Sequence, residues 1–103
     1  MPDPTSPRYT LDPRRLGHIF RDAPGHFADD TPENRRLLEE TANQPENDLG
    51  HDSRYGNRWF ARIQPGGTQI WVKTRGSLII EGGINPAPRP FNPETGLAEP
   101  PVE

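Results

Sequence analysis

Two of the three histidines, His18 and His26, lie eight residues apart in the segment RRLGHIFRDAPGH. Histidine exchanges a proton near neutral pH, so two imidazoles beside a phosphate group can act as general base and general acid. The competing interpretation is two polar side chains on a surface loop, because glycine and proline interrupt this segment. A metal site has less support, since the spacing does not place both rings on one helix face and the chain has no cysteine. The sequence therefore predicts no metal.

The charges are segregated along the chain, which the net charge of -3 conceals. Residues 22–52 carry nine acidic side chains against two arginines, a local balance of -7. Residues 53–80 carry no acidic side chain and a local balance of +5, from Arg54, Arg58, Arg62, Lys73 and Arg75. Such segregation creates a field that attracts a polyanion even when the whole chain is acidic.

Length and composition indicate one small domain. A chain of 103 residues with 29% hydrophobic residues can bury one thin core layer, without disulfides because cysteine is absent. No apolar run approaches the roughly 18 residues of a membrane span, and the N-terminus lacks a signal-peptide core. Since the apolar residues cluster in the middle of the chain, we expect a proline-rich linker at 1–13, one domain at 14–97 and a disordered tail at 98–103.

The segment DTPENRRLLEETANQ predicts the clearest helix. Thr31 is a good N-cap, Pro32 fits the first helical position, and Pro45 ends the pattern. Upstream, RRLGHIF can add a short helical turn. From residue 57 the pattern changes to three strands, NRWFARIQ, TQIWVKTR and SLIIEGGIN.

A two-residue turn at Gly66 and Gly67 would pair Ile63 with Ile70 and so fix the faces of the first hairpin. One face then carries apolar residues that pack on the helix: Trp59, Ala61, Ile63, Ile70 and Val72. The other face is cationic with interleaved aromatics: Arg58, Phe60, Arg62, Gln64, Gln69, Trp71, Lys73 and Arg75. A second turn, at Gly76 and Ser77, would place Arg75 beside Leu78 and Lys73 beside Ile80.

The cationic face has the composition that single-stranded RNA requires, with cations for phosphates and flat rings for unstacked bases. The predicted RNA-binding residues are Arg58, Phe60, Arg62, Gln69 and Trp71. The alternative is an ordinary solvated sheet face. Such a face usually mixes signs to gain cross-strand pairs, and this one contains no acidic residue.

Four phrases in order resemble C-terminal toxin domains of bacterial polymorphic toxin and contact-dependent inhibition systems over residues 16–97: LGHIFRDAPGH, TPENRRLLEETA, YGNRWFARIQPGGTQIWVKTRGSLIIEGGIN and FNPETGL. The order of helix and sheet also resembles the group that joins barnase, the EndoU nucleases, the tRNA-cutting colicins and the RelE toxins. The resemblance implies an α+β fold, with one or two N-terminal helices on a three- to four-stranded antiparallel sheet. It also implies a metal-independent endoribonuclease without cofactor, monomeric apart from an acidic immunity protein, and delivered from a larger secreted or cell-surface protein into the cytoplasm of a target bacterium.

By position, the resemblance makes His18 or His26 the catalytic histidine and Lys73, Thr74 and Arg75 the strand-borne catalytic residues. No catalytic glutamate on a central strand is expected, because residues 53–80 hold no acid. One histidine would remove the proton from a ribose 2'-hydroxyl, which attacks the adjacent phosphorus. The other histidine, or Thr74 through a water, would protonate the departing 5'-oxygen, while Lys73 and Arg75 stabilise the phosphate.

The candidate substrate of the ribonuclease is RNA in general and tRNA in particular. Two other function classes compete with this prediction. The first is a non-catalytic binding module that docks an acidic protein or polyanion on the cationic face. The second is a toxin enzyme with another target, such as DNA or a nucleotide.

Overall fold

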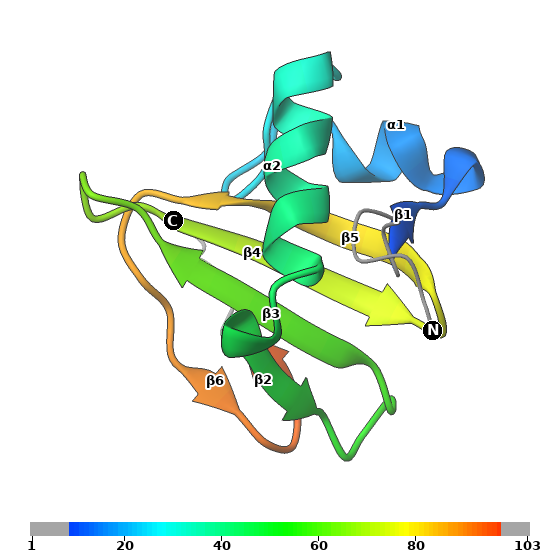
Figure 1. The fold of residues 1–103 in the computed structure, drawn as a ribbon, viewed down its shortest axis with the longest axis vertical. Coiled ribbons are helices and arrows are strands. Elements are labelled where there is room, and N and C mark those ends of the chain that lie inside the picture. Colours follow the sequence, from blue (N-terminus) through cyan, green and yellow to red (C-terminus); the bar gives the residue numbers. More distant parts are fainter. Residues whose placement is uncertain (1–8, 98–103) are drawn as a thin grey trace.

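The computed structural model describes residues 9–97, so the predictions for residues 1–8 and 98–103 lie outside the described residues. Within this range the chain forms a five-stranded sheet, a separate two-stranded hairpin and short helices, which confirms the α+β class (Figure 1). The sheet order is β1-β5-β4-β3-β2. The elements are β1 Thr10–Leu11, η1 Pro13–Arg15, α1 Leu16–Ile19, α2 Pro32–Ala42, η2 Pro45–Asn47, β2 Asp48–His51, β3 Arg58–Ile63, β4 Gln69–Arg75, β5 Leu78–Asn85, β6 Phe91–Asn92 and β7 Gly96–Leu97.

The helix α2 forms where the sequence predicts it. The Thr31 hydroxyl accepts a hydrogen bond from the backbone N–H of Asn34 at 3.1 Å, a cap that stabilises a helix by about 1 kcal/mol. Pro32 occupies the first turn, and Pro45 opens the next element, η2. Leu38 is fully buried and joins α2 to the core of the sheet.

The strand β1 corrects the predicted linker boundary at residue 13. Thr10 pairs with Leu78 and Leu11 pairs with Ile79, in parallel orientation at the edge of the sheet. The sheet is therefore mixed and five-stranded, whereas the expected antiparallel arrangement of three or four strands describes only β2 to β5. A two-residue strand that pairs with a segment far along the chain leaves no local periodicity from which to predict it.

The β3–β4 hairpin has a three-residue loop at 65–67, and the predicted register is wrong for this reason. The Gln64 N–H donates to the Thr68 carbonyl, and the Gly67 N–H donates to the Gln64 carbonyl, both at 2.8 Å. Gly67 has φ 93°, the left-handed conformation that closes a three-residue hairpin loop and that favours glycine.

The change of one residue in register moves the side chains of β3 to the opposite face relative to β4. Ile63 pairs with Gln69 and Ala61 with Trp71. The predicted cationic face is therefore divided between the two sides of the sheet. The α2 side carries Arg58, Phe60 and Arg62 with Ile70, Val72 and Thr74, and the other side carries Trp59, Ala61 and Ile63 with Gln69, Trp71, Lys73 and Arg75.

The β4–β5 hairpin starts in the predicted register and then changes it at a bulge. Arg75 pairs with Leu78, as expected, but Lys73 pairs with Glu81 and not with Ile80. A bulge adds one residue to a strand and can re-aim a side chain. This bulge places a carboxylate beside Lys73, where the predicted register has the apolar Ile80.

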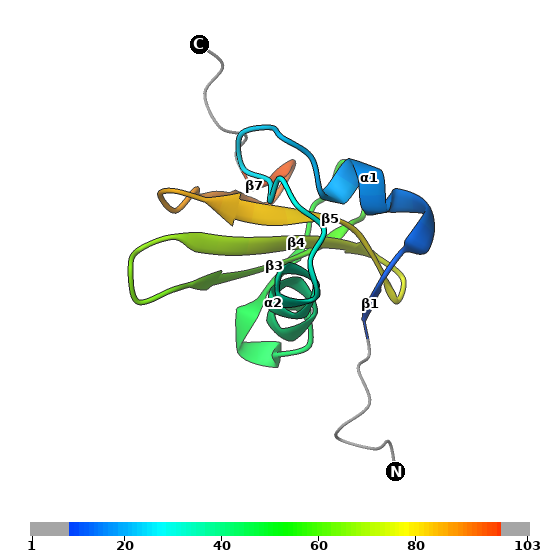
Figure 2. The same ribbon diagram turned by 90° about the horizontal axis from the view of Figure 1, so that it is seen from above.

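The sheet is covered on both faces, by α2 on one and by α1 with the segment that follows it on the other (Figure 2). Two glycines of β5 allow both covers to come close. A Cβ at Gly82 would lie 3.0 Å from a methyl group of Leu38, and a Cβ at Gly83 would lie 2.8 Å from the His26 Cα and overlap the Gly25 carbonyl oxygen. The backbone that carries His26 therefore rests directly on β5.

Candidate active site

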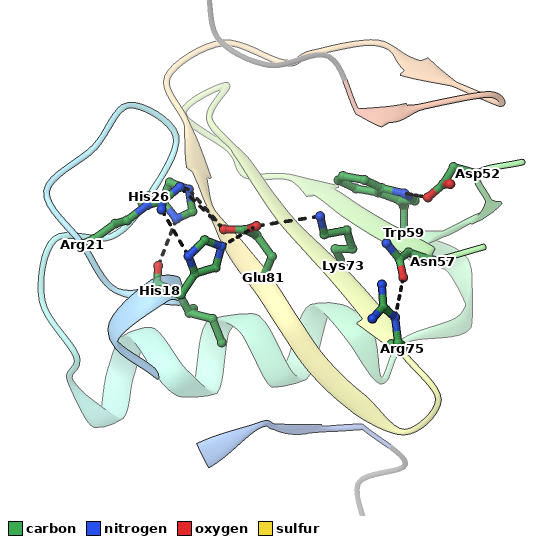
Figure 3. A network of polar contacts seen from close by, with 10 residues as sticks. His18, Arg21, His26, Asp52, Asn57, Trp59, Lys73, Arg75 and Glu81 are labelled. Atoms are coloured by element: carbon green, nitrogen blue, oxygen red, sulfur yellow. Dashed lines mark hydrogen bonds and ion pairs between the residues drawn. The ribbon is translucent and has the colours of Figure 1, made fainter. Parts of the chain in front are cut away.

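The carboxylate of Glu81, on the face opposite α2, is the point at which four other side chains meet (Figure 3). His18 Nε2 lies 3.0 Å and Lys73 Nζ 3.8 Å from its Oε2 atom. His26 Nε2 lies 3.5 Å and Arg21 Nη2 3.8 Å from Oε1. We call these five residues the Glu81 cluster. It combines groups that transfer protons with groups that bind phosphate.

Hydrogen bonds fix the orientation of both imidazoles. Arg21 Nη1 lies 3.2 Å from His18 Nδ1, and Arg21 Nη2 lies 3.1 Å from His26 Nε2. A guanidinium only donates, so these two ring nitrogens accept. The other ring nitrogens then donate, from His18 Nε2 to Glu81 and from His26 Nδ1 to the Ile19 carbonyl at 3.0 Å. Both rings are neutral in this arrangement, and Arg21 covers the proton-accepting nitrogen of each.

Exposure divides the cluster into an outer and an inner part. The side chains of His18 and Arg21 are 42% and 43% exposed, whereas those of Glu81 and His26 are 15% and 6% exposed. The Oε1 atom of Glu81 is buried and accepts no hydrogen bond from the described residues. Arg21 and Lys73 compensate its charge, because a buried carboxylate is costly without a nearby cation. With neutral imidazoles, two cations and one anion leave a charge of +1.

The backbone next to His26 is held by the sheet. The Arg21 N–H donates to the Phe27 carbonyl at 3.0 Å, which closes the segment 21–27 on itself. The Gly25 carbonyl then accepts two hydrogen bonds, from Trp71 Nε1 at 2.8 Å and from the Ile84 N–H at 3.1 Å. His26 is therefore positioned by β4 and β5 as well as by its own loop.

Two tryptophans lie on the sheet beside the cluster and support it. The rings of Trp59 and Trp71 stack with centroids 6.0 Å apart, and Trp71 also meets His26 edge-on at 5.5 Å. Lys73 Nζ lies 5.3 Å from a ring centroid of Trp59, within the range of a cation–π contact. The C-terminal hairpin covers Trp59, since a Cβ at Gly96 would overlap its ring. Trp71 is thus part of the scaffold of the site.

Asp52 holds Trp59 in place through a hydrogen bond from the indole N–H. Its carboxylate is buried and accepts hydrogen bonds from Trp59 Nε1 at 2.8 Å and from the N–H groups of Tyr55 and Gly56 at 2.5 and 3.1 Å. Burial alone would raise the pKa of the Asp52 carboxyl, but these hydrogen bonds outweigh it and hold the pKa below its ordinary value. Asp52 is therefore a structural carboxylate that stays ionised.

Three residues predicted for the site lie in the interior, which corrects their predicted roles. Phe60 is 2% exposed in the core shared with α2, so its ring offers no face to a base, and the wrong hairpin register explains the error. Gln69 is 4% exposed and its side-chain oxygen accepts hydrogen bonds from Asn85 and Arg89. Thr74 is 1% exposed and donates to a backbone carbonyl, so it cannot pass a proton to a substrate through a water.

The remaining predicted cations do not reach the Glu81 carboxylate. Arg58 and Arg62 lie on the α2 side of the sheet, where Arg58 pairs with Asp48 at 2.5 Å. Arg75 shares a face with Lys73, but its Nε donates to Asn57 at 3.2 Å and no contact joins it to Glu81 among the residues drawn (Figure 3). Of the predicted catalytic residues, the structure brings together His18, His26 and Lys73.

Glu81 and Arg21 were not among the residues predicted from the sequence. The expectation of no carboxylate rested on residues 53–80, and Glu81 is the next residue along the chain. A signal was present, because a lone acid inside the strand SLIIEGGIN is costly unless it has partners. Arg21 lies three residues after His18, a spacing at which side chains on a helical turn become neighbours.

Residues 9–97 contain no helix that is long and apolar enough to cross a bilayer. Within the same range, no three or more His, Cys, Asp or Glu side chains are grouped so that they could hold a metal ion. In comparisons with known proteins, no family model, curated protein or solved structure matches the chain. A functional assignment therefore rests on the geometry of the Glu81 cluster.

Proposed function

We propose that the protein is a metal-independent endoribonuclease with the Glu81 cluster as its active site. The observation that carries the proposal is the convergence of two imidazoles, a guanidinium and an ammonium on one carboxylate. Internal transphosphorylation of RNA needs a base, an acid and cations that stabilise the phosphate, and the nucleophile belongs to the substrate. The cluster supplies each of these groups.

In this proposal His18 is the base. Glu81 holds its Nε2–H, so Nδ1 carries the lone pair that takes the proton of the ribose 2'-hydroxyl. The 2'-oxygen bonds to the adjacent phosphorus and the bond from phosphorus to the 5'-oxygen breaks. The products are a 2',3'-cyclic phosphate and a 5'-hydroxyl. Once Arg21 has left His26 Nε2, this nitrogen takes up a proton from solvent, facing Glu81 Oε1 at 3.5 Å, and then gives it to the departing 5'-oxygen.

Arg21 couples substrate binding to these proton transfers. Its guanidinium donates to His18 Nδ1 and to His26 Nε2, the two nitrogens that the reaction uses. A phosphate group competes for the guanidinium because it accepts two parallel hydrogen bonds, and its arrival would release both rings. Arg21 and Lys73 then stabilise charge on the phosphate oxygens, and removing one such interaction costs about 10²-fold in rate.

The proposal is tested by incubating the purified chain with total RNA in EDTA, beside His18→Ala, His26→Ala and Lys73→Ala. We expect the unmodified chain to leave 2',3'-cyclic phosphate ends and each variant to lose about 10²-fold or more of the rate. His51→Ala is the matched control, because His51 is an exposed histidine on β2 near Arg58, outside the cluster. The control should cleave at the unmodified rate.

Two outcomes would contradict the proposal. Cleavage that EDTA abolishes would require a metal ion and a different mechanism. Intact RNA in every lane would favour the non-catalytic module, which binds a polyanion and leaves it unchanged.

The wider role we propose is a toxin domain that acts inside a target bacterium, with tRNA as the candidate substrate and an acidic immunity protein as the partner. The support is the resemblance in layout, together with the positive charge of a cluster that an acidic partner could cover. Expression in a bacterial cytoplasm tests this role. The unmodified chain should stop growth and His18→Ala should not, and normal growth with an active purified enzyme would contradict the toxin role.

A further inference from the structure

A pocket of about 470 Å³ is lined in part by Ile80, which precedes Glu81 in β5, and none of its lining residues takes part in the proposed reaction. Three guanidiniums and one carboxylate in its wall give an excess of two positive charges. The lining residues are Asp12, Arg14, Arg15, Arg75, Leu78 and Ile80.

The three guanidiniums that line the pocket differ in whether an ion pair already occupies them. Two hydrogen bonds of 3.2 Å join the side chains of Arg14 and Asp12, and they hold the pKa of the Asp12 carboxyl below its ordinary value. Arg14 and Asp12 thus neutralise each other. Arg15 and Arg75 form no ion pair within the described part of the chain, although Arg15 lies near enough to Asp12 to help lower the pKa of its carboxyl and Arg75 Nε donates to Asn57. The remaining N–H groups of both guanidiniums are available to a ligand.

The pocket continues the Glu81 cluster along two elements at once. On β4, Arg75 follows Lys73 by two residues on the same face, which is about 6.6 Å further along the strand. Arg15, which also lines the pocket, ends η1 and is the N-cap of α1, three residues before His18. A polymer with one phosphate at the cluster would therefore bring its next unit to the pocket.

The chemistry of the lining matches one nucleotide. Guanidinium groups bind phosphate oxygens in pairs, which an ammonium cannot do. Leu78 and Ile80 supply the apolar part of the lining, on which a base can lie. We propose that this pocket is a subsite for the nucleotide next to the scissile phosphate of single-stranded RNA. This inference rests on the proposed ribonuclease function.

The kinetic test compares a dinucleotide, which has only the scissile phosphate, with a pentanucleotide of RNA. The double variant Arg15→Gln/Arg75→Gln should lose about tenfold more of its kcat/KM on the pentanucleotide than on the dinucleotide, the effect of one charge-assisted hydrogen bond. Arg36→Gln is the control, because Arg36 is an exposed arginine on α2, on the other side of the sheet. Equal losses on both substrates would overturn the subsite.

A binding test needs no catalysis and separates the two proposals. Fluorescence anisotropy measures the affinity of the full chain for a labelled 2'-deoxy pentanucleotide, which cannot undergo transphosphorylation. The double variant should bind about tenfold more weakly. The slope of the logarithm of its binding constant against the logarithm of the salt concentration should become smaller in magnitude by about 0.7 for each phosphate group that it no longer binds. If the unmodified chain binds through the pocket but cleaves no RNA, the proposed function fails and only the binding of a nucleotide in the pocket remains supported.

Three results of the binding test would overturn the subsite and leave the ribonuclease in place. The first is an active enzyme whose double variant binds the pentanucleotide as tightly as the unmodified chain. The second is an active enzyme that shows no binding of the pentanucleotide at all. The third is displacement of the oligonucleotide by poly-L-glutamate when both polyanions are present at the same concentration of negative charge. That result would assign the pocket to an acidic protein.

Discussion

The side chains around Glu81 differ in solvent exposure, and this difference separates their roles in the proposed reaction. His18 and Arg21 are more than two-fifths exposed and can meet a substrate directly. His26 is nearly buried and becomes available only when Arg21 moves, because Arg21 covers its Nε2 atom. Glu81 contacts all of them, so its negative charge is the property that holds the cluster in one geometry.

Glu81→Gln removes that charge and keeps the shape and one acceptor for His18. We expect kcat for RNA to fall by about 10²-fold or more, because the hydrogen bond to His18 loses its charged acceptor and both cations lose their counter-charge. Steady-state kinetics with the unfolding midpoint as a check on folding measure this effect. Glu40→Gln, on the exposed face of α2, is the matched control. An unchanged kcat in Glu81→Gln would exclude a role of the carboxylate in the reaction.

Asp52 leads to a prediction about acid stability. Its folded pKa lies below the unfolded value of about 3.9, so its contribution is fully present above the unfolded pKa and is lost as pH falls through the folded pKa. Asp52→Asn should lower the free energy of unfolding at neutral pH by about 1–3 kcal/mol, since several hydrogen bonds lose their ionised acceptor. The variant should also lose less stability than the unmodified chain as the pH falls below about 4.

Urea unfolding at a series of pH values measures both effects of Asp52→Asn. Asp29→Asn is the control, since Asp29 is an exposed aspartate whose carboxylate forms no hydrogen bond within residues 9–97. Parallel curves of unfolding free energy against pH for Asp52→Asn and the unmodified chain would refute the role assigned to Asp52.

Local signals account for the elements that were predicted correctly. Thr31, Pro32 and Pro45 define both ends of α2, and each acts within a few residues of itself. The turn at Gly76 and Ser77 likewise sets the start of the β4–β5 hairpin. Such signals are readable from one sequence because the chemistry of the cap or turn is in the residue types themselves.

The errors in the predicted strand register arise where the same residues fit two different turns. The sequence PGG suits a two-residue turn at 66–67 as well as a loop at 65–67, and only the second gives the observed register. No residue type in LIIE signals the bulge in β5, although the bulge is the reason that Glu81 lies beside Lys73. The pairing of β1 depends on a partner far along the chain. The helix α2 and the strands β3 to β5 were therefore predictable. The lone acid in β5 signalled that Glu81 has partners, but which side chains these are depends on the bulge and was not predictable.

Gly83→Ala tests how the strand β5 positions His26. The added methyl would overlap the Gly25 carbonyl oxygen, so the segment 21–27 must shift and weaken its hydrogen bonds from Trp71 and Ile84. We expect a loss of about 1–3 kcal/mol in stability, typical of an overpacked core, together with a lower kcat. Gly66→Ala is the matched control, because nothing lies within 4 Å of its Cβ and its φ is not positive. Full activity in Gly83→Ala would show that His26 does not depend on this close approach.

The acidic side chains of α2 and the cations of the Glu81 cluster lie on opposite faces of the sheet. The acidic side chains Glu33, Glu39 and Glu40 belong to α2, which covers one face of the sheet (Figure 2). Arg58 and Arg62 of β3 lie on that same face, whereas Lys73 and Arg75 of β4 lie on the opposite one. Screening limits the reach of each charge to about 8 Å at physiological salt. An RNA strand on the site therefore interacts mainly with the cations of its own face.

This separation predicts the salt dependence of RNA cleavage. The logarithm of kcat/KM should fall linearly with the logarithm of the salt concentration, with a slope of about -0.7 for each phosphate of a single strand that the protein binds. Lys73→Ala should reduce the magnitude of the slope by about 0.7. Glu33→Lys, on α2 across the sheet, should leave the slope unchanged, because its charge is screened from the site. Kinetics between low and physiological salt measure the slopes. If Glu33→Lys changed the slope as much as Lys73→Ala, the attraction would come from the charge of the whole protein and the proposed binding of a phosphate by Lys73 would be wrong.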